Sequence, residues 1–181
     1  MARNIEIKAK VDDVAFCLKE ARELSGLPGQ EIVQEDYFFN CSNGRLKLRV
    51  LSEDRGELIF YNRADQKGPK TSEYHISLTG EPDNLKQLLE RSYGVKGVVK
   101  KTRQLFLAGR TRIHIDQVEH LGDFLEFEVV LAENEDSDIG EVEARKLMEQ
   151  FNISDHQLIS HAYVDLLIDQ QKKDCSGNEP S

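Results

Sequence analysis

Long apolar stretches are missing from this sequence. No run of apolar residues approaches the roughly 20 that a membrane-spanning helix needs. The first residues also lack the charged and then apolar pattern of a secretory leader. We therefore expect no membrane partner, and we expect the protein to be cytoplasmic, in a reducing compartment.

Motifs built on cysteine or on glycine-rich loops are also absent. Cys17, Cys41 and Cys175 are odd in number and widely spaced, which indicates neither a disulfide framework nor a zinc site. No P-loop and no G-x-G-x-x-G sequence occurs. A phosphate site formed by glycine-rich backbone is therefore not expected.

Positive net charge is lacking as well, because 24 Lys and Arg residues face 33 Asp and Glu residues, for a formal net charge of -9. An acidic protein is not drawn to nucleic acid, so we expect no nucleic-acid partner. The 181 residues, 39% of them hydrophobic, suit one globular domain. We place this domain at residues 1–169 and expect the polar residues 170–181 to form a disordered C-terminal tail.

Alternation of polar and apolar residues dominates what is present. Asn4, Glu6 and Lys8 alternate with Ile5 and Ile7, and this period of two is typical of a strand with two unlike faces. The same pattern predicts strands at 4–11, 45–50, 57–63, 74–78, 110–116 and 124–131.

Helical spacing of apolar residues occurs in fewer places. Asp12 or Asp13 can cap a helix that ends at Gly26, and a second helix follows Pro82. In that second helix we expect Leu88 to face inward. Two more helices are predicted at about 139–151 and 158–166. Many antiparallel strands with a few helices give the α+β class.

The charged strand faces repeat one sign of charge. The pairs are Lys47 with Arg49, Arg110 with Arg112, and Glu126 with Glu128. An ordinary sheet with one solvated face would show the same alternation. Like charges at neighbouring positions on one face repel, however, and a ligand of opposite charge would relieve the repulsion.

A candidate metal site follows from the last hairpin. If that hairpin closes symmetrically, Asp116 lies opposite Glu126 and His114 lies opposite Glu128. Asp116, Glu126 and Glu128 then cluster, with Glu6 as a candidate fourth ligand. Carboxylates at this density suit Mg²⁺ or Mn²⁺.

Two nearby residues have open roles. His114 either assists proton transfer or is the hydrogen-bonded partner of Glu128. Tyr61 is either a wall residue or a catalyst. Lys100 points outward by parity and is a poor candidate for the site.

The basic residues come from several strands and therefore surround a volume, unlike the linear stripe of nucleic-acid binders. Arg offers a planar fork for phosphate oxygens, and Lys offers a compact charge. The candidate substrate-binding residues are Lys8, Lys47, Arg49, Arg63, Lys101, Arg103, Arg110 and Arg112.

These residues lie in segments that resemble a known family. Residues 4–8, N-I-E-I-K, resemble the opening E-x-E-x-K motif of CYTH proteins, which include class IV adenylyl cyclases, thiamine triphosphatases and inorganic triphosphatases. The first Glu of that motif is Asn4 here. The resemblance covers residues 3–168 in the family's order, through segments 34–39, 44–49, 57–63, 68–72, 97–103, 111–116, 121–128 and 162–167.

The resemblance implies a closed antiparallel β-barrel of about eight strands, a triphosphate tunnel with charged faces inward and helices packed outside. It also implies that Glu6, Glu126 and Glu128 ligate metal, with Asp116 nearby. The residues whose counterparts contact the triphosphate are Lys8, Lys47, Arg49, Arg63, Lys101, Arg103 and Arg112.

Three functions are open at this point. The first is a Mg²⁺- or Mn²⁺-dependent triphosphatase, with Lys8, Arg63 and Glu126 as catalytic residues and a nucleotide, thiamine triphosphate or tripolyphosphate as substrate. The second is a class IV adenylyl cyclase. The third is a noncatalytic polyphosphate or nucleotide binder that lost its chemistry with the first Glu. We expect a monomer or a homodimer.

Overall fold

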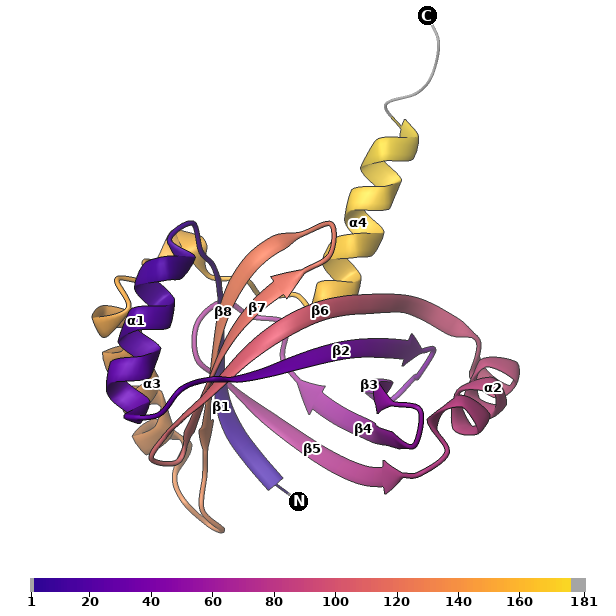
Figure 1. Ribbon diagram of the computed structural model, residues 1–181, viewed down its shortest axis with the longest axis horizontal. Coiled ribbons are helices and arrows are strands. Elements are labelled where there is room, and N and C mark those ends of the chain that lie inside the picture. Colours follow the sequence, from indigo (N-terminus) through magenta and orange to yellow (C-terminus); the bar gives the residue numbers. More distant parts are fainter. Residues whose placement is uncertain (1, 177–181) are drawn as a thin grey trace, which may run out of the picture.

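Eight antiparallel strands close on themselves in the order β1-β5-β4-β3-β2-β6-β7-β8 (Figure 1). The computed structural model describes residues 2–176. The expected eight-stranded barrel is confirmed. The strands are β1 (Ala2–Lys10), β2 (Gln30–Phe39), β3 (Arg45–Ser52), β4 (Arg55–Arg63), β5 (Lys70–Thr79), β6 (Val95–Ala108), β7 (Thr111–Val118) and β8 (Gly122–Val130).

Helices lie outside the barrel. They are α1 (Val14–Ser25), α2 (Pro82–Tyr93), α3 (Ser137–Gln150) and α4 (Tyr163–Ser176), with a short 3₁₀ turn at Asp155–Gln157. Figure 1 shows α1 and α3 together beside the barrel, α2 near the far ends of β2 to β5, and α4 leading away from the barrel. Within the described residues, no helix is both long and apolar enough to cross a membrane.

Local sequence explains where α1 begins and ends. The Asp13 carboxylate accepts a hydrogen bond from the Phe16 backbone N–H at 2.9 Å, which satisfies one free donor of the first turn. Gly26 ends the helix with φ 66°, in the left-handed region that glycine adopts without strain. The expected cap and stop are therefore confirmed.

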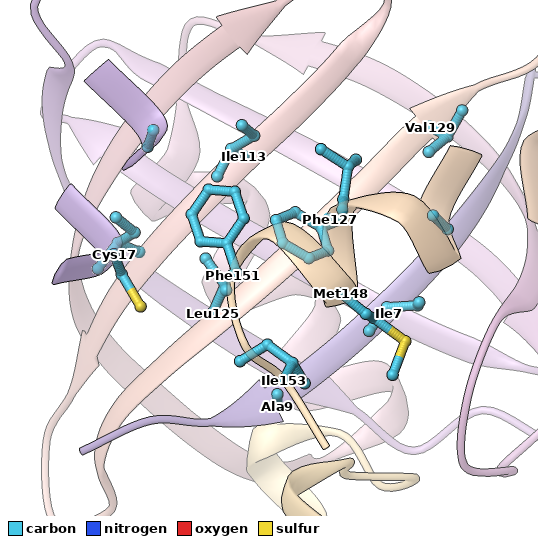
Figure 2. Close-up of a cluster of buried hydrophobic side chains, with 14 of the residues drawn as sticks. Ile7, Ala9, Cys17, Ile113, Leu125, Phe127, Val129, Met148, Phe151 and Ile153 are labelled. Atoms are coloured by element: carbon cyan, nitrogen blue, oxygen red, sulfur yellow. The ribbon is translucent and has the colours of Figure 1, made fainter. Parts of the chain in front are cut away.

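The largest hydrophobic core lies between the barrel wall and the outer helices (Figure 2). Ile7 of β1, Ile113 of β7 and Phe127 of β8 point outward and pack with Met148 of α3 and with Phe151. The apolar side of the alternation is thus the outer face of the barrel. The charged side faces inward as a consequence.

β2 and β6 lack a clean alternation because both of their faces carry polar groups. In β2, Glu35 is directed outward while Gln34 and Asp36 line or support the interior. In β6, Lys100 pairs with Glu35 on the outside and Lys101 points inward, so the outward prediction for Lys100 is confirmed. Period-two analysis finds only strands whose two faces differ in polarity.

Two helix predictions need correction. Leu88, expected to face inward, is 59% exposed, because α2 packs on the barrel through Leu85 and Leu89. The helix expected from residue 158 begins at Tyr163, because Leu158 forms a β-bridge with Ala9 and the Ile159 N–H donates to the Lys8 carbonyl at 2.8 Å.

The C-terminal helix reaches farther than the sequence suggests. α4 continues through Ser176, so it includes residues 170–176 of the segment expected to be a disordered tail. Residues 177–181 lie outside the described residues.

Candidate active site

The barrel interior contains a cavity of about 660 Å³. Inward-facing side chains from all eight strands line it, and Ala162 and Tyr163 lie against it at one end. Tyr163 packs there with Phe38, Val99 and Phe124, so apolar side chains fill that end of the barrel. The opposite end, which we call the mouth, is lined by Ile32, Leu51, Ile76 and Leu105.

One group of charges is organised by Asp36 of β2. Its carboxylate accepts hydrogen bonds from the Lys47 ammonium at 2.8 Å and from the Arg49 guanidinium at 2.9 and 3.2 Å. Burial opposes ionisation of Asp36, but Arg49 and Lys47 hold its pKa far below the usual range. The repeated positive charges on β3 are therefore neutralised in part by a residue that the sequence analysis did not select.

A second group is organised by Asp116 of β7, which is fully buried. It accepts hydrogen bonds from Lys101 at 2.8 Å, from Arg103 at 2.6 and 2.7 Å, and from the Tyr163 hydroxyl at 3.1 Å. Asp116 is not among the side chains that line the cavity. It was expected among the metal ligands, but its oxygens are already occupied by these donors.

The acidic side of the cavity is formed by Glu6, Glu126 and Glu128. Glu6 accepts a hydrogen bond from Arg63 at 2.8 Å, and Glu126 lies 3.6 Å from the Lys8 ammonium. Burial, followed by repulsion from the Glu126 carboxylate, raises the pKa of Glu6 to about 7. Glu6 is thus partly protonated near neutral pH, whereas the Lys8 charge outweighs burial and helps to hold the pKa of Glu126 well below its usual range.

His114 lies beside Glu126 and Glu128. Its Nδ1 atom lies 3.8 Å from an oxygen of Glu126 and 3.8 Å from an oxygen of Glu128. These distances exceed a hydrogen bond, so the expected bond to Glu128 is not present. One potential ligand atom from each of the three residues lies within 4.8 Å of the others, which is a candidate metal centre. Neutral imidazole is the form available, since burial lowers the pKa of His114.

Four buried polar atoms in the described residues lack a hydrogen-bond partner, and every one belongs to a residue that lines the cavity. They are Asn4 Oδ1, Gln34 Oε1, Arg63 Nε and His114 Nδ1. Buried polar groups without partners are rare in native proteins. Their gathering around one cavity, with both donors and acceptors among them, suits a polar ligand together with a cation.

The register of the last hairpin differs from the expected one. Val118 pairs with Gly122, so Asp116 faces Phe124, and His114 faces Glu126. The turn carries positive φ angles at His120 (66°) and Gly122 (91°), and the Leu121 N–H donates to Val118. A three-residue loop with a glycine bulge displaces the pairing from the symmetric one.

Arg110 is the one expected substrate-binding residue that lies outside the cavity. It sits in the turn before β7, where it forms ion pairs with Glu135 at 2.6 Å and with Glu143 at 2.8 Å. The alternation that aligned Arg110 with Arg112 does not continue through that turn. We therefore do not include Arg110 in the site.

The other expected residues are brought together. The lining of the cavity includes Lys8, Lys47, Arg49, Arg63, Lys101, Arg103, Arg112, Glu6, Glu126 and Glu128. Sequence reasoning missed Asp36 and Tyr163 as parts of the site. Both lie in segments already matched to the family, but only the folded barrel shows that they contact the cations. Tyr61, whose role was open, also lines the cavity.

Comparison with known proteins agrees with this arrangement. The family model described as "CYTH domain" matches residues 2–163. A Methanocaldococcus jannaschii protein named "Putative adenylate cyclase MJ0240" is 28% identical over 177 residues, which cover 90% of this chain and 97% of that protein.

Solved structures share the fold. The PH1012 protein from Pyrococcus horikoshii superposes with a TM-score of 0.77 at 21% identity, covering 90% of this chain and 98% of that one. A Vibrio parahaemolyticus protein described as a "putative adenylate cyclase" gives a TM-score of 0.69 at 20% identity, covering 91% and 97%. With a family model matched along almost the whole described chain, this protein belongs to the CYTH domain family.

Proposed function

We propose that this protein is a divalent-metal-dependent enzyme that hydrolyses a small organic triphosphate inside the barrel. The observation that carries the proposal is the cavity itself, in which Lys and Arg side chains from several strands face a cluster of glutamates. A ligand that carries many phosphate oxygens and brings a divalent cation matches both halves of this arrangement.

Charge pairing in the cavity supports a multivalent anion. Lys47 and Arg49 share Asp36, and Lys101 and Arg103 share Asp116, while Arg49 and Arg103 also lie 3.7 Å from Glu57 and 3.1 Å from Glu126. Eight Lys and Arg side chains line the cavity, against six Asp and Glu side chains, so the lining carries an excess of cations. An uncompensated buried charge costs several kcal/mol. Phosphoryl oxygens would supply the missing negative charge, and the planar guanidinium groups can bind them in bidentate fashion.

Catalysis in this proposal is mainly electrostatic. Glu6, Glu126 and Glu128 would hold a divalent cation, which supplies Lewis-acid neutralisation of phosphoryl charge. Arg63, kept in place by its hydrogen bond to Glu6, would contact a phosphate oxygen as negative charge develops. Lys8 lies 4.1 Å from the Tyr163 ring centroid and near Glu126, which positions its ammonium for the same oxygens.

The mouth favours a substrate with an organic group. Ile76 at the mouth is 50% exposed, and Ile32, Leu51 and Leu105 line the cavity beside it. Apolar side chains around the opening of a charged cavity suit a base or another ring, which inorganic tripolyphosphate lacks.

A class IV adenylyl cyclase is the second candidate, favoured by the name of the Methanocaldococcus jannaschii relative. In that reaction a ribose 3′-oxygen would attack the α-phosphorus of ATP, and pyrophosphate would leave. A noncatalytic binder is the third candidate, because Asn4 supplies an amide where the family motif has a carboxylate. For all three we propose a cytoplasmic protein, monomeric or homodimeric, which suits the free thiols of Cys17 and Cys41.

A substrate panel tests the proposal. Pure protein is incubated with Mg²⁺ or Mn²⁺ and with ATP, thiamine triphosphate or tripolyphosphate. Metal-dependent phosphate release from an organic triphosphate is the expected result. Cyclic AMP with pyrophosphate would instead establish the second candidate, and tight binding without turnover the third.

Two neighbouring lysines provide matched variants. Lys101→Met removes an inward cation of β6, and Lys100→Met removes an outward one from the same strand. We expect Lys101→Met and Glu126→Gln to lower turnover at least tenfold and Lys100→Met to leave it unchanged. Undiminished metal-dependent turnover in Glu126→Gln would show that the site is placed wrongly.

A further inference from the structure

We propose that His114 is a nitrogen ligand of the cation in the barrel, and that the site therefore selects a first-row transition ion such as Mn²⁺ over Mg²⁺. This inference rests on the proposed function only in requiring that the cavity hold a divalent cation. It assigns a ligand outside the glutamate set, and it concerns which cation is held.

The spacing of the ligand atoms supports this assignment. Ligand atoms that lie about 2.1 Å from one ion are about 3 to 3.5 Å from each other. His114 Nδ1 lies 3.8 Å from an oxygen of Glu126 and 3.8 Å from one of Glu128. The three atoms all lie within 4.8 Å of one another, so side-chain shifts on the order of 1 Å would bring them onto one ion.

The strand pairing holds His114 in this place. β7 pairs with β8 so that His114 lies directly across from Glu126, and Glu128 is the next inward residue of β8. Neighbouring inward residues of β7 have other partners, because Arg112 binds Glu128 at 2.7 Å and Asp116 binds Arg103. Within β7, His114 is the residue with a buried side-chain atom, Nδ1, that faces the two glutamates and has no hydrogen-bond partner.

The unused nitrogen is an observation independent of the acidic cluster. His114 is 3% exposed, and its Nδ1 has no hydrogen-bond partner in the described residues. A buried polar group without a partner is unfavourable, because it has lost its hydrogen bonds to water. Coordination of a cation by this nitrogen would give it a partner.

Ligand chemistry connects the nitrogen to ion choice. Mg²⁺ prefers oxygen ligands in octahedral geometry and gives up its waters reluctantly. Imidazole binds first-row transition ions, whereas a purely carboxylate set suits Mg²⁺ as well as Mn²⁺. Replacing one oxygen by His114 Nδ1 thus favours Mn²⁺ over Mg²⁺ without changing the charge of the site.

Calorimetry on the full chain, treated with chelator and titrated with MnCl₂ or MgCl₂, tests the inference. We expect wild type to bind Mn²⁺ at least about tenfold more tightly than Mg²⁺, in line with the effect of a single ligand-shell contact. His114→Leu should remove this preference by weakening Mn²⁺ binding while leaving Mg²⁺ binding nearly unchanged. His75→Leu, which alters an exposed histidine of β5, should behave as wild type.

A spectroscopic measurement on the wild-type protein tests the same inference directly. Electron spin echo spectroscopy of the Mn²⁺-loaded protein should show nitrogen modulation in wild type and His75→Leu, and none in His114→Leu. Absence of nitrogen modulation in wild type would overturn the inference even if His114→Leu failed to fold.

The outcomes separate the two proposals. If neither ion binds wild type, the metal-dependent function fails together with the inference. If both ions bind and the ratio of the Mn²⁺ and Mg²⁺ dissociation constants is the same in His114→Leu as in wild type, only the role of His114 is overturned.

Discussion

Asp36 and Glu6 are both carboxylates in the barrel interior, yet their surroundings give them opposite protonation behaviour. Asp36 lies between two cations that it binds directly, and its pKa is held far below the usual range. Glu6 has one Arg partner and a second glutamate beside it, and its pKa is raised to about 7. Residue type alone cannot distinguish these cases, because the number and sign of the neighbouring charges decide the outcome.

The raised pKa of Glu6 predicts how stability changes with pH in the metal-free protein. Glu6 has an ordinary pKa of 4.5 and a folded pKa of about 7. Its stabilising contribution is therefore fully present below pH 4.5 and is lost as pH rises through 7, at up to about 1.4 kcal/mol per pH unit. Urea unfolding of wild type and Glu6→Gln at pH 5 to 8 measures this contribution as a difference between the two proteins.

The free energy of unfolding of wild type should fall relative to that of Glu6→Gln as pH rises. The comparison with Glu6→Gln also removes the contribution of His114, whose lowered pKa gives a slope of the opposite sign. A difference that stays constant from pH 5 to pH 8 would show that Glu6 ionises normally in the folded protein.

Asp36→Asn tests the balance of charge at the other side of the cavity. Removal of this carboxylate charge leaves Lys47 without its partner and Arg49 with Glu57 at 3.7 Å, and breaking a buried pair in this way costs about 3 to 5 kcal/mol. We expect the free energy of unfolding to fall by that amount. We also expect tripolyphosphate to raise the melting temperature of the variant more than that of wild type, because the anion replaces the lost charge.

The neighbouring residue of β2 supplies the control for that variant. Glu35 points outward and pairs with Lys100, so Glu35→Gln should change stability by less than about 0.5 kcal/mol. A small effect of Asp36→Asn, comparable with that of Glu35→Gln, would contradict the charge balance described for the cavity.

At the scale of elements, the helices hold the barrel wall from outside, and α3 does so through a close approach at Gly140. A Cβ atom at this position would lie 2.7 Å from Ile5 of β1 and 2.7 Å from Leu131, both in the main core. A helical Gly→Ala change gains up to about 1 kcal/mol in propensity, whereas overpacking a core costs about 1 to 3 kcal/mol. Packing should win.

Gly140→Ala is therefore expected to lower the free energy of unfolding by about 1 to 2 kcal/mol, measured by urea denaturation. Arg145→Ala, at an exposed position of the same helix, should be neutral. Increased stability in Gly140→Ala would mean that α3 can move away from β1 without loss of packing.

At the scale of the whole molecule, the cavity joins all eight strands, so a ligand in it stabilises the entire barrel. A ligand that binds only the folded state adds about 2.7 kcal/mol when present at 100 times its dissociation constant. For a chain of this size, that corresponds to a rise of about 5 to 10 °C in melting temperature.

We expect tripolyphosphate with Mn²⁺ to produce such a rise in one cooperative transition, observed by calorimetry. Lys101→Met should reduce the rise, and Lys100→Met should not. Two separate transitions, of which only one responds to the ligand, would contradict binding within a single closed barrel.

Much of this structure could be predicted from the sequence. Strands such as β1 and β8 were predictable because a pleated strand sends successive side chains to opposite faces, so unlike faces leave a period of two. The order of motifs, from residues 4–8 to the segment 121–128, predicted the family and with it the closed barrel. The residues of the cavity were also largely predictable, because like charges repeat along those strands.

Other features depend on how distant segments pack in the folded barrel. Alternation in β7 does not say where the strand starts, so Arg110 was grouped with Arg112 although a turn directs it to Glu135 and Glu143. The pairing of His114 with Glu126 depends on the loop at His120, whose bulge no periodicity reveals. Which side chains share a face follows from the order of residues along each strand, since that is a local property of the backbone. Which charges meet across the barrel depends on strand register and closure, and these are set by contacts between distant segments.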